Sequence, residues 1–452
     1  MIAPARVAAY EILRRVSNGR ADLPGAIAGV RPSLPDERDR ALATDIATGA
    51  VRWRGALDVL IASAATRPIA RLDGEVVDIL RLSLYQLLHL TRVPASAVVD
   101  DGVQLTKKAG KKSASGFVNA VLRGISRNRQ HLPLPRRPDN GSDRDAALDY
   151  LSITLSHPRW LAERWFDRVG FERTEAWMRF NNEPAPLTLR TNPLRTTRVD
   201  LLEHLAALEV QAHAARFAPD GIIVDEGNLQ DEVARGEFVV QDEASQLVAL
   251  LAGQEPGPLV LDTCASPGGK ATAIAMTLDV GARLVACDVR QKRMALLRRT
   301  VAASGALNVR LVQADATRPL PFSRPFSTVI VDAPCSGLGT LRRDPDIRWT
   351  RGPESLAALA SAQQRLLANA AAVVEPGGRL VYATCSSEPE ENEQVARAFL
   401  AAHPMFTPVR ANTAHPAVLP DVVDRAGHLR TEPDRHGLEL FFGAVFERAR
   451  NL

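Results

Sequence analysis

Four short apolar segments follow one another in the second half of this chain, and each ends in an aspartate or a glycine-rich turn. The first of them is an unbroken apolar run, typical of a strand buried on both faces of a parallel sheet, and the other three are expected to be further strands of it. Any one of these aspartates could instead cap a helix. Ligands of open α/β sheets bind beyond the carboxyl ends of the strands, so the whole series predicts one shared site. The segments are residues 259–262, 283–288, 309–315 and 327–332.

The first segment runs into a turn that suits a bound cofactor. Glycines let the backbone approach a ligand closely, and the N–H groups that start the helix expected at 271–278 favour a carboxylate or phosphate. The turn lacks the G-x-G-x-x-G spacing, so it is a weak signal alone. Asp288 ends the second segment, where an acid can bind ribose hydroxyls. The candidate turn is Cys264, Ala265, Ser266, Pro267, Gly268, Gly269 and Lys270, and the other candidate carboxylates are Asp315 and Asp332.

Two of the four cysteines directly follow apolar runs, Cys335 in a Pro-Cys-Ser-Gly sequence and Cys385 in a Thr-Cys-Ser sequence. A thiolate beside a bound cofactor can act as a covalent nucleophile. Free cysteine also often behaves as a small buried hydrophobe, so from the residues alone both interpretations stay open. Cys287 lies inside an apolar run, where we expect core packing, and Cys264 is expected to pack in the cofactor turn.

Length and composition predict an intracellular protein of several domains. A chain of 452 residues with 46% hydrophobic residues suggests about three domains with ordinary cores. The cysteines form no C-x-x-C pair, so we expect neither a metal site nor a disulfide framework. No run of ~18 apolar residues is present, so we expect a cytoplasmic protein without membrane contact. The expected parts are a helical domain at 1–130, a linker at 131–145, a small α+β domain at 146–253 and an α/β domain at 254–452.

Basic residues gather between residues 104 and 130, although the net charge of the chain is only +4. Seven lysines and arginines fall in this stretch without any acidic residue. A solvated helix face usually mixes the two signs, so contact with a polyanion is favoured. Trp160 and Trp165 have helical spacing and are expected to pack rather than to stack on bases. The candidate polyanion contacts here are Lys107, Lys108, Lys111, Lys112 and Arg123.

Three motifs in the second half of the chain closely resemble those of the RNA cytosine-5 methyltransferases. They are the turn at 264–270, the block at 332–349, and the run at 382–387 followed by Glu390-Glu391-Asn392-Glu393. The first 130 residues are similar to a NusB-like domain, most clearly at 85–87 and 117–123. Taken together, the chain resembles the RsmB (Fmu/Sun) type of this family, which methylates small-subunit ribosomal RNA.

This resemblance implies a Rossmann-like, S-adenosylmethionine-dependent methyltransferase domain preceded by an all-α NusB-like domain and a small α+β domain. It places the cofactor at the turn, with Asp288 at the ribose, Asp315 beside the adenine, and Asp332 nearby. It makes Cys385 the nucleophile and Cys335 the group that helps release the product, with Lys270 and Asp332 also in the catalytic group. We expect a monomer that binds small-subunit ribosomal RNA, with further RNA contacts from Arg342, Arg343 and Arg348.

Three alternatives stay open. DNA cytosine-5 methyltransferases use the cysteine of a Pro-Cys motif, which here is Pro334-Cys335. The RNA-type motif around Cys385 and the run at 342–349 favour Cys385 instead. The substrate could be transfer RNA or large-subunit ribosomal RNA. The chain could also be a non-catalytic, antitermination-like RNA-binding factor, although its intact cysteines and carboxylates argue against this.

Overall fold

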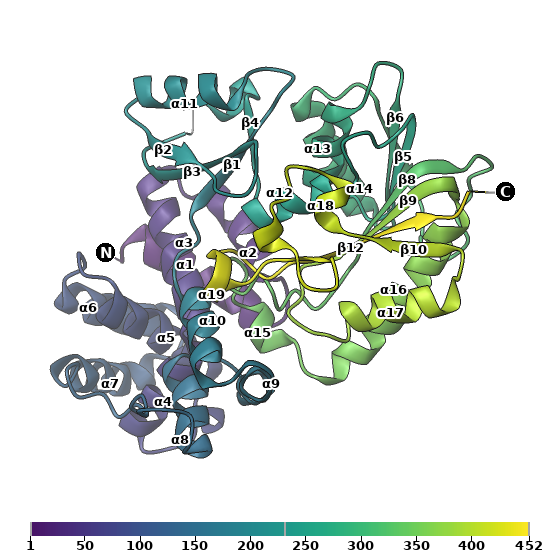
Figure 1. Cartoon of the computed structure of the whole chain (residues 1–452). Helices are drawn as coiled ribbons and strands as arrows, with labels where there is room; N and C mark the ends of the chain where they lie inside the picture. The colour runs from purple at the N-terminus through teal and green to yellow at the C-terminus, as the bar shows by residue number, and fades with distance from the viewer. Residues whose placement is uncertain (1, 230–231, 451–452) are drawn as a thin grey trace. The chain divides into compact units, whose positions relative to one another are not determined.

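The computed structural model describes residues 2–229 and 232–450 and divides the chain into two compact units (Figure 1). The helical unit contains the residues up to Pro184 together with Leu341–Arg351. The sheet unit contains Ala185–Thr340 and the chain from Gly352 onward. This grouping differs from the predicted three-domain division, which stays a prediction. Among the described residues, no helix is both long enough and apolar enough to cross a membrane.

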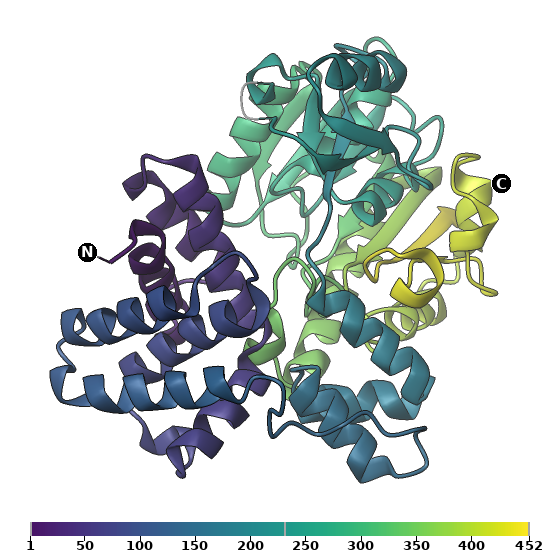
Figure 2. The ribbon, with the colours of Figure 1, turned by 90° about the vertical axis from the view of Figure 1, so that its left-hand side faces the viewer.

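Helix α5 (Gly74–His89) forms the centre of the helical unit. All of its residues from Val76 to Leu87 are buried, as is typical of a helix covered on every side. Asp73 caps its start by accepting the N–H of Glu75. Figure 2 shows the helices of this unit packed against one another, in purple to blue except for α15, which is green. The others are α1 (Pro4–Ser17), α2 (Leu23–Val30), α3 (Glu37–Arg52), α4 (Arg54–Ala65), α6 (Ala95–Lys108), α7 (Ser115–Arg127), α8 (Arg144–Asp149), α9 (Arg159–Val169), α10 (Phe171–Asn182) and α15 (Ile347–Thr350).

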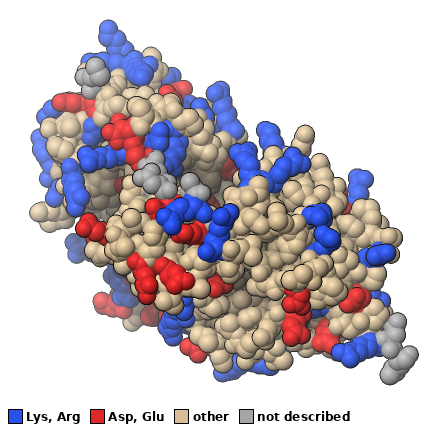
Figure 3. Space-filling model, turned by 90° about the horizontal axis from the view of Figure 1, so that it is seen from above, with Lys and Arg blue, Asp and Glu red and all other residues tan. Residues whose placement is uncertain are grey.

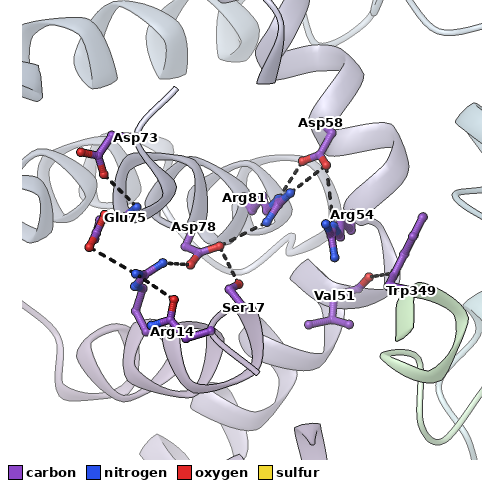
Figure 4. A network of polar contacts seen from close by, with 11 residues as sticks. Arg14, Ser17, Val51, Arg54, Asp58, Asp73, Glu75, Asp78, Arg81 and Trp349 are labelled. Carbon is purple, nitrogen blue, oxygen red and sulfur yellow. Dashed lines mark hydrogen bonds and ion pairs between the residues drawn. The ribbon is translucent and has the colours of Figure 1, made fainter. Parts of the chain in front are cut away.

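A network of charged side chains joins α1, α4 and α5 (Figure 4). Asp78 on α5 accepts hydrogen bonds from Arg14 at 2.8 Å and from Ser17 at 3.0 Å, both on α1. Arg81, one turn further along α5, pairs with Asp78 and with Asp58 of α4. Only 2% of the Asp78 side chain is exposed, so its charge depends on these donors rather than on water.

The sheet unit begins with a four-stranded antiparallel sheet in the order β2-β3-β1-β4. Leu201 and Leu205 of α11 (Arg198–Ala207) pack in the core of this sheet with Leu189 and Ile222. The expected mixture of helix and strand in the middle of the chain is therefore present. The strands are β1 (Leu187–Thr191), β2 (Gln211–Ala214), β3 (Gly221–Glu226) and β4 (Phe238–Val240).

The second sheet has eight strands, in the order β10-β12-β9-β8-β5-β6-β7, with β11 paired to β12. Strands β5 to β9 are parallel, and β12 and β10 add antiparallel strands at one edge. The strand order reverses at β5, which lies between β6 and β8, so a ligand crevice is expected at its carboxyl end. The strands are β5 (Leu259–Asp262), β6 (Arg283–Asp288), β7 (Val309–Gln313), β8 (Phe326–Asp332), β9 (Val374–Thr384), β10 (Phe406–Val409), β11 (Leu429–Arg430) and β12 (Phe442–Arg448).

Helices cover both faces of this sheet (Figure 1). Successive strand residues point to opposite faces, and the apolar residues on each face pack against a different set of helices. Val260 and Ile330 belong to the core formed with α12 and α13, whereas Leu261 and Val331 belong to the core formed with α16 and α17. The predicted α/β fold is confirmed. The bounds of the third and fourth predicted strands differ by one or two residues, and the helix expected at 271–278 lies at Gly269–Thr277. The helices are α12 (Glu243–Leu250), α13 (Gly269–Thr277), α14 (Gln291–Ser304), α16 (Glu354–Ala372) and α17 (Glu393–Ala402).

Candidate active site

Three neighbouring strands of the large sheet end in carboxylates: β5 in Asp262, β6 in Asp288 and β8 in Asp332. The strands are parallel, so these three residues lie at the same edge. Asp262 is fully buried and accepts the N–H of Cys264 at 3.2 Å. Its second oxygen has no hydrogen-bond partner among the described residues. Burial raises the pKa of Asp262 to about 7, and the negative charge of Asp332 adds to this effect.

The turn after β5 leads directly into α13. Gly268 has a φ of +113°, and a Cβ there would lie 2.9 Å from the Leu297 side chain, so the position favours glycine. Arg293 on α14 joins the turn to Asp288, because it donates to the Ser266 carbonyl at 2.5 Å and to the Asp288 carboxylate at 3.1 Å. Arg293 was not predicted. The only sequence signal for it is its position in the first turn of α14, shortly after Asp288.

Lys270 and Asp332, two predicted catalytic residues, form an ion pair with Nζ and Oδ2 2.8 Å apart. Lys270 lies in the first turn of α13, and Asp332 ends β8. Asp315 follows β7, the strand at the edge of the sheet beside β6. It accepts hydrogen bonds from the N–H and hydroxyl of Thr317. These bonds lower the pKa of Asp315. The structure thus brings Lys270 and Asp332 together and leaves Asp315 with local partners.

The two candidate nucleophiles meet at the ends of adjacent strands. Cys335 follows β8 and Cys385 follows β9, and these strands are parallel with Asp332 opposite Ala383. The two Sγ atoms are 3.3 Å apart. The hydrogen bond with Cys335 and burial hold the pKa of the Cys385 thiol well above its usual range, while Lys270 acts in the opposite direction. Positive charge near Cys385, such as that of Lys270, favours its thiolate.

A buried carboxylate holds the two cysteine loops together. Glu391 accepts hydrogen bonds from the N–H of Ser336 at 2.8 Å and from its hydroxyl at 2.5 Å. It also accepts the hydroxyl of Ser386 at 2.5 Å and the amide of Gln363 at 3.0 Å. Glu391 has no exposed surface. The motif around it was recognised in the sequence, but the role of this side chain was not predicted.

Of the four residues expected to pack, Cys287 and Trp165 are fully buried, whereas Trp160 and Cys264 are half-buried. Cys287 is fully buried in β6, and burial raises the pKa of its thiol to about 12. Trp165 is also fully buried and lies edge-on to Trp177, with ring centroids 5.4 Å apart. Neither side chain is available to a ligand in this structure.

The predicted RNA contact of Arg348 is wrong, because its side chain is fully buried in the helical unit. It donates to the backbone carbonyls of Ser156 at 3.0 Å and Asn181 at 3.2 Å. Arg342 is also mostly covered, with its guanidinium 4.3 Å from the centre of the Phe180 ring and only 13% of its side chain exposed. Arg343 is half-buried, and its RNA contact stays a prediction.

The basic stretch on α6 and α7 is mostly accessible. Lys111 pairs with Asp73 at 2.6 Å, so part of its charge is already neutralised. On the face seen in Figure 3, basic and acidic side chains are interspersed, in keeping with the small net charge. RNA contact by the four predicted residues that are exposed stays a prediction: Lys107, Lys108, Lys112 and Arg123.

One group of potential metal ligands lies outside the strand-end site. His204, Glu232 and Glu237 place ligand atoms within 4.8 Å of one another. Arg235 pairs with Glu232 at 3.6 Å and with Glu237 at 3.0 Å. A cation would have to compete with this guanidinium for both carboxylates.

Three stretches of this chain match known protein families. The family described as 16S rRNA methyltransferase RsmB/F matches residues 248–447, the NusB family matches residues 3–127, and the RsmF/B-like methyltransferase ferredoxin-like domain matches residues 157–229. The probable ribosomal RNA small subunit methyltransferase B of Bacillus subtilis is 32% identical, over 90% of this chain and 90% of its own length. The ribosomal RNA small subunit methyltransferase B of Pseudomonas putida is 36% identical, over 88% and 89%. The crystal structure of PH0851 matches with a TM-score of 0.81 at 25% identity and covers 99% of both chains.

Proposed function

We propose that this chain, which belongs to the 16S rRNA methyltransferase RsmB/F family, transfers a methyl group from S-adenosylmethionine to C5 of a cytosine in small-subunit ribosomal RNA. The observation that carries the proposal is the pair of thiols, Cys335 and Cys385, 3.3 Å apart at the edge of the sheet where the carboxylates gather. The charge of Lys270 acts on the Cys385 thiol at that edge. The names of the relatives support the small ribosomal subunit as the substrate.

The residues around β5 fit S-adenosylmethionine. Gly268, with its positive φ, turns the chain from β5 into α13, whose first N–H groups have no side-chain cap and suit the carboxylate of the cofactor. Asp288, held in place by Arg293, ends the strand whose tip commonly binds ribose hydroxyls. The unpartnered oxygen of Asp262 offers a further acceptor. When bound, the cofactor supplies an electrophilic methyl group on a positively charged sulfur.

Cys385 is the nucleophile of the proposed reaction. Its thiolate adds to C6 of the cytosine and forms a carbon–sulfur bond, which makes C5 electron-rich enough to take the methyl group. A base must then remove the C5 proton, so that the double bond between C5 and C6 reforms as the bond to Cys385 breaks. Covalent catalysis of this kind divides one difficult step into two easier ones.

Cys335 is placed to move a proton in the second half of this reaction. Its Sγ is within hydrogen-bond distance of the nucleophile, so it also lies close to the C5–C6 edge of a cytosine bonded to Cys385. Lys270, paired with Asp332, contributes positive charge that favours the Cys385 thiolate. A target cytosine must be unpaired or flipped, because C6 is not accessible in a stacked duplex.

A binding-only factor is the alternative from another class, and transfer RNA or large-subunit RNA are the alternative substrates. We assign RNA binding to the NusB-like helices in either case. The thiol pair, the Lys270–Asp332 ion pair and the glycine turn together support catalysis, since RNA binding requires none of them.

The test is transfer of label from methyl-labelled S-adenosylmethionine to protein-free small-subunit RNA, followed by digestion to nucleosides. Wild type should place the label in 5-methylcytidine, and Cys385→Ala should place none. Cys287→Ala, which changes a cysteine buried in the same sheet, is the matched control and should retain activity. Label in another nucleoside, or only in transfer or large-subunit RNA, would overturn the proposal. RNA binding without any transfer would favour the binding-only factor.

A further inference from the structure

One segment of the chain belongs to the helical unit although the residues on both sides of it belong to the sheet unit. This segment, Leu341–Arg351, begins six residues after Cys335. The chain therefore runs from the thiol loop into the helical unit and returns to the sheet unit at Gly352. We call Leu341–Arg351 the tether.

The tether is held in the helical unit by buried polar contacts. The Arg348 guanidinium donates to several acceptors, among them the side-chain oxygen of Asn182 at 2.9 Å and the carbonyl of Leu341, within the tether itself, at 3.3 Å. Asp346 accepts the N–H of Leu23 at 3.0 Å. Trp349 donates its indole N–H to the Val51 carbonyl at 2.8 Å (Figure 4).

These contacts join the tether to three separate parts of the helical unit. Leu23 starts α2, Val51 lies in α3, and Asn182 ends α10. Hydrogen bonds to a buried guanidinium are stronger than neutral ones, and their loss leaves buried carbonyls unpaired. The tether is therefore fixed to the helices at both the start and the end of the unit's sequence.

The chain just before the tether is bonded to the backbone of the proposed nucleophile. Gly339 donates its N–H to the carbonyl of Cys385 at 2.9 Å and accepts the N–H of Leu440 at 3.1 Å. A Cβ at Gly339 would lie 2.0 Å from the Leu440 carbonyl oxygen, so no slack remains on that side. Only Thr340 separates this bonded residue from Leu341.

We infer that the tether positions Cys335 against Cys385, so that the helical unit controls the geometry of the thiol pair, and that Arg348 is a positioning residue for the reaction. The inference rests on the proposed function and adds to it a role for the helical unit other than RNA binding. A displacement of Leu341 passes through Thr340 to the residue that is bonded to Cys385.

The sharpest test is to insert two glycines between Thr340 and Leu341, which slackens the chain while every contact of the tether stays available. The matched control is the same insertion after Gly281, an exposed turn glycine with open space around it. A misplacement of about 1 Å can cost a hundredfold in rate, so we expect kcat to fall by about that factor in the first variant. The KM for S-adenosylmethionine should not change, and the control should match wild type.

A second measurement works even when no methyl transfer occurs. Iodoacetamide labelling of Cys335 and Cys385 in the full-length protein, followed by mass spectrometry of the two peptides, reports the thiol pair directly. Both the insertion and Arg348→Met should label faster than wild type, because the thiols lose their mutual hydrogen bond. Arg365→Met, an exposed arginine on α16, is the control substitution.

The two proposals fail in distinguishable ways. If wild type is inactive but the insertion variant is labelled faster, the proposed function is wrong and the positioning role of the tether is supported. If wild type is active and the insertion variant has the same kcat and the same labelling rates as wild type, the positioning role of the tether is wrong. Circular dichroism melting shows whether Arg348→Met folds, and the insertion decides the question if it does not.

Discussion

The Sγ atoms of Cys335 and Cys385 lie 3.3 Å apart although fifty residues separate them in the chain. The parallel pairing of β8 with β9 brings them to one edge of the sheet. Neither thiol can move without disturbing the other, because each loop is also bonded to Glu391. The two thiols are therefore held together as one structural element.

Substitution Cys335→Ala should trap the covalent intermediate. Cys385 can still attack C6 in this variant, but the group placed to accept the C5 proton is gone, so the bond to Cys385 breaks slowly. We expect a protein–RNA adduct that survives denaturing gels, with turnover reduced by about 10² or more. An adduct in Cys385→Ala and none in Cys335→Ala would instead make Cys335 the nucleophile.

The parts of the fold that depend on local pattern were predictable. Strands buried on both faces appear as unbroken apolar runs, and β5 and β6 have the predicted bounds. The grouping of Asp262, Asp288 and Asp332 followed from the rule that parallel strands end at a common edge, whereas Asp315 has local partners. These features need only short-range sequence information and one topological rule.

Arg348 and Glu391 show what local pattern does not reveal. Arg348 bonds to carbonyls of Ser156 and Asn181, 192 and 167 residues earlier in the chain, so nothing near it in sequence shows that it is buried. A cluster of arginines in an RNA enzyme looks like a phosphate contact until its tertiary surroundings are known. Glu391 is similarly defined by Ser336, 55 residues away.

Asp262→Asn should change how stability depends on pH. Burial raises the pKa of Asp262 from its ordinary value of 3.8 to about 7 in the folded protein, so the folded state binds a proton more tightly than the unfolded one. The stabilising contribution of Asp262 to the free energy of unfolding is fully present below pH 4 and is lost as the pH rises through 7. The loss amounts to about 4 kcal/mol by linkage.

The measurement is the melting temperature of cofactor-free protein between pH 4.5 and 8. The melting temperature of Asp262→Asn should fall less across this range than that of wild type, and burial of Asp344, which raises its pKa to about 6, accounts for part of the dependence that stays. The control is Asp315→Asn, because hydrogen bonds from Thr317 lower the pKa of Asp315 and its titration lies below this range. Parallel curves for wild type and Asp262→Asn would contradict the prediction.

Asp78→Ala should strongly destabilise the helical unit. The substitution removes the buried carboxylate with which Arg14 and Arg81 both pair. Removing one partner of a buried ion pair typically costs about 3 to 5 kcal/mol. Lys111→Ala removes an ion pair at the solvent-exposed surface and should leave the stability nearly unchanged. Urea denaturation followed by circular dichroism compares the two, and equal shifts would show that Asp78 does not depend on its partners in this way.

Glu391→Ala should loosen the thiol pair as well as lower stability. The substitution leaves the buried N–H of Ser336 without its acceptor, which costs about 1 to 3 kcal/mol. The hydroxyls of Ser336 and Ser386 can still bond to each other, and the Gln363 amide still donates to the Pro334 carbonyl. Glu391→Gln keeps one acceptor oxygen and should lie between Glu391→Ala and wild type. Because Glu391 joins the two cysteine loops, iodoacetamide should label Cys335 and Cys385 faster in the alanine variant, at a temperature where the protein remains folded. A loss of stability with wild-type labelling rates would mean that the backbone bonds of the two loops hold the thiols together without this carboxylate.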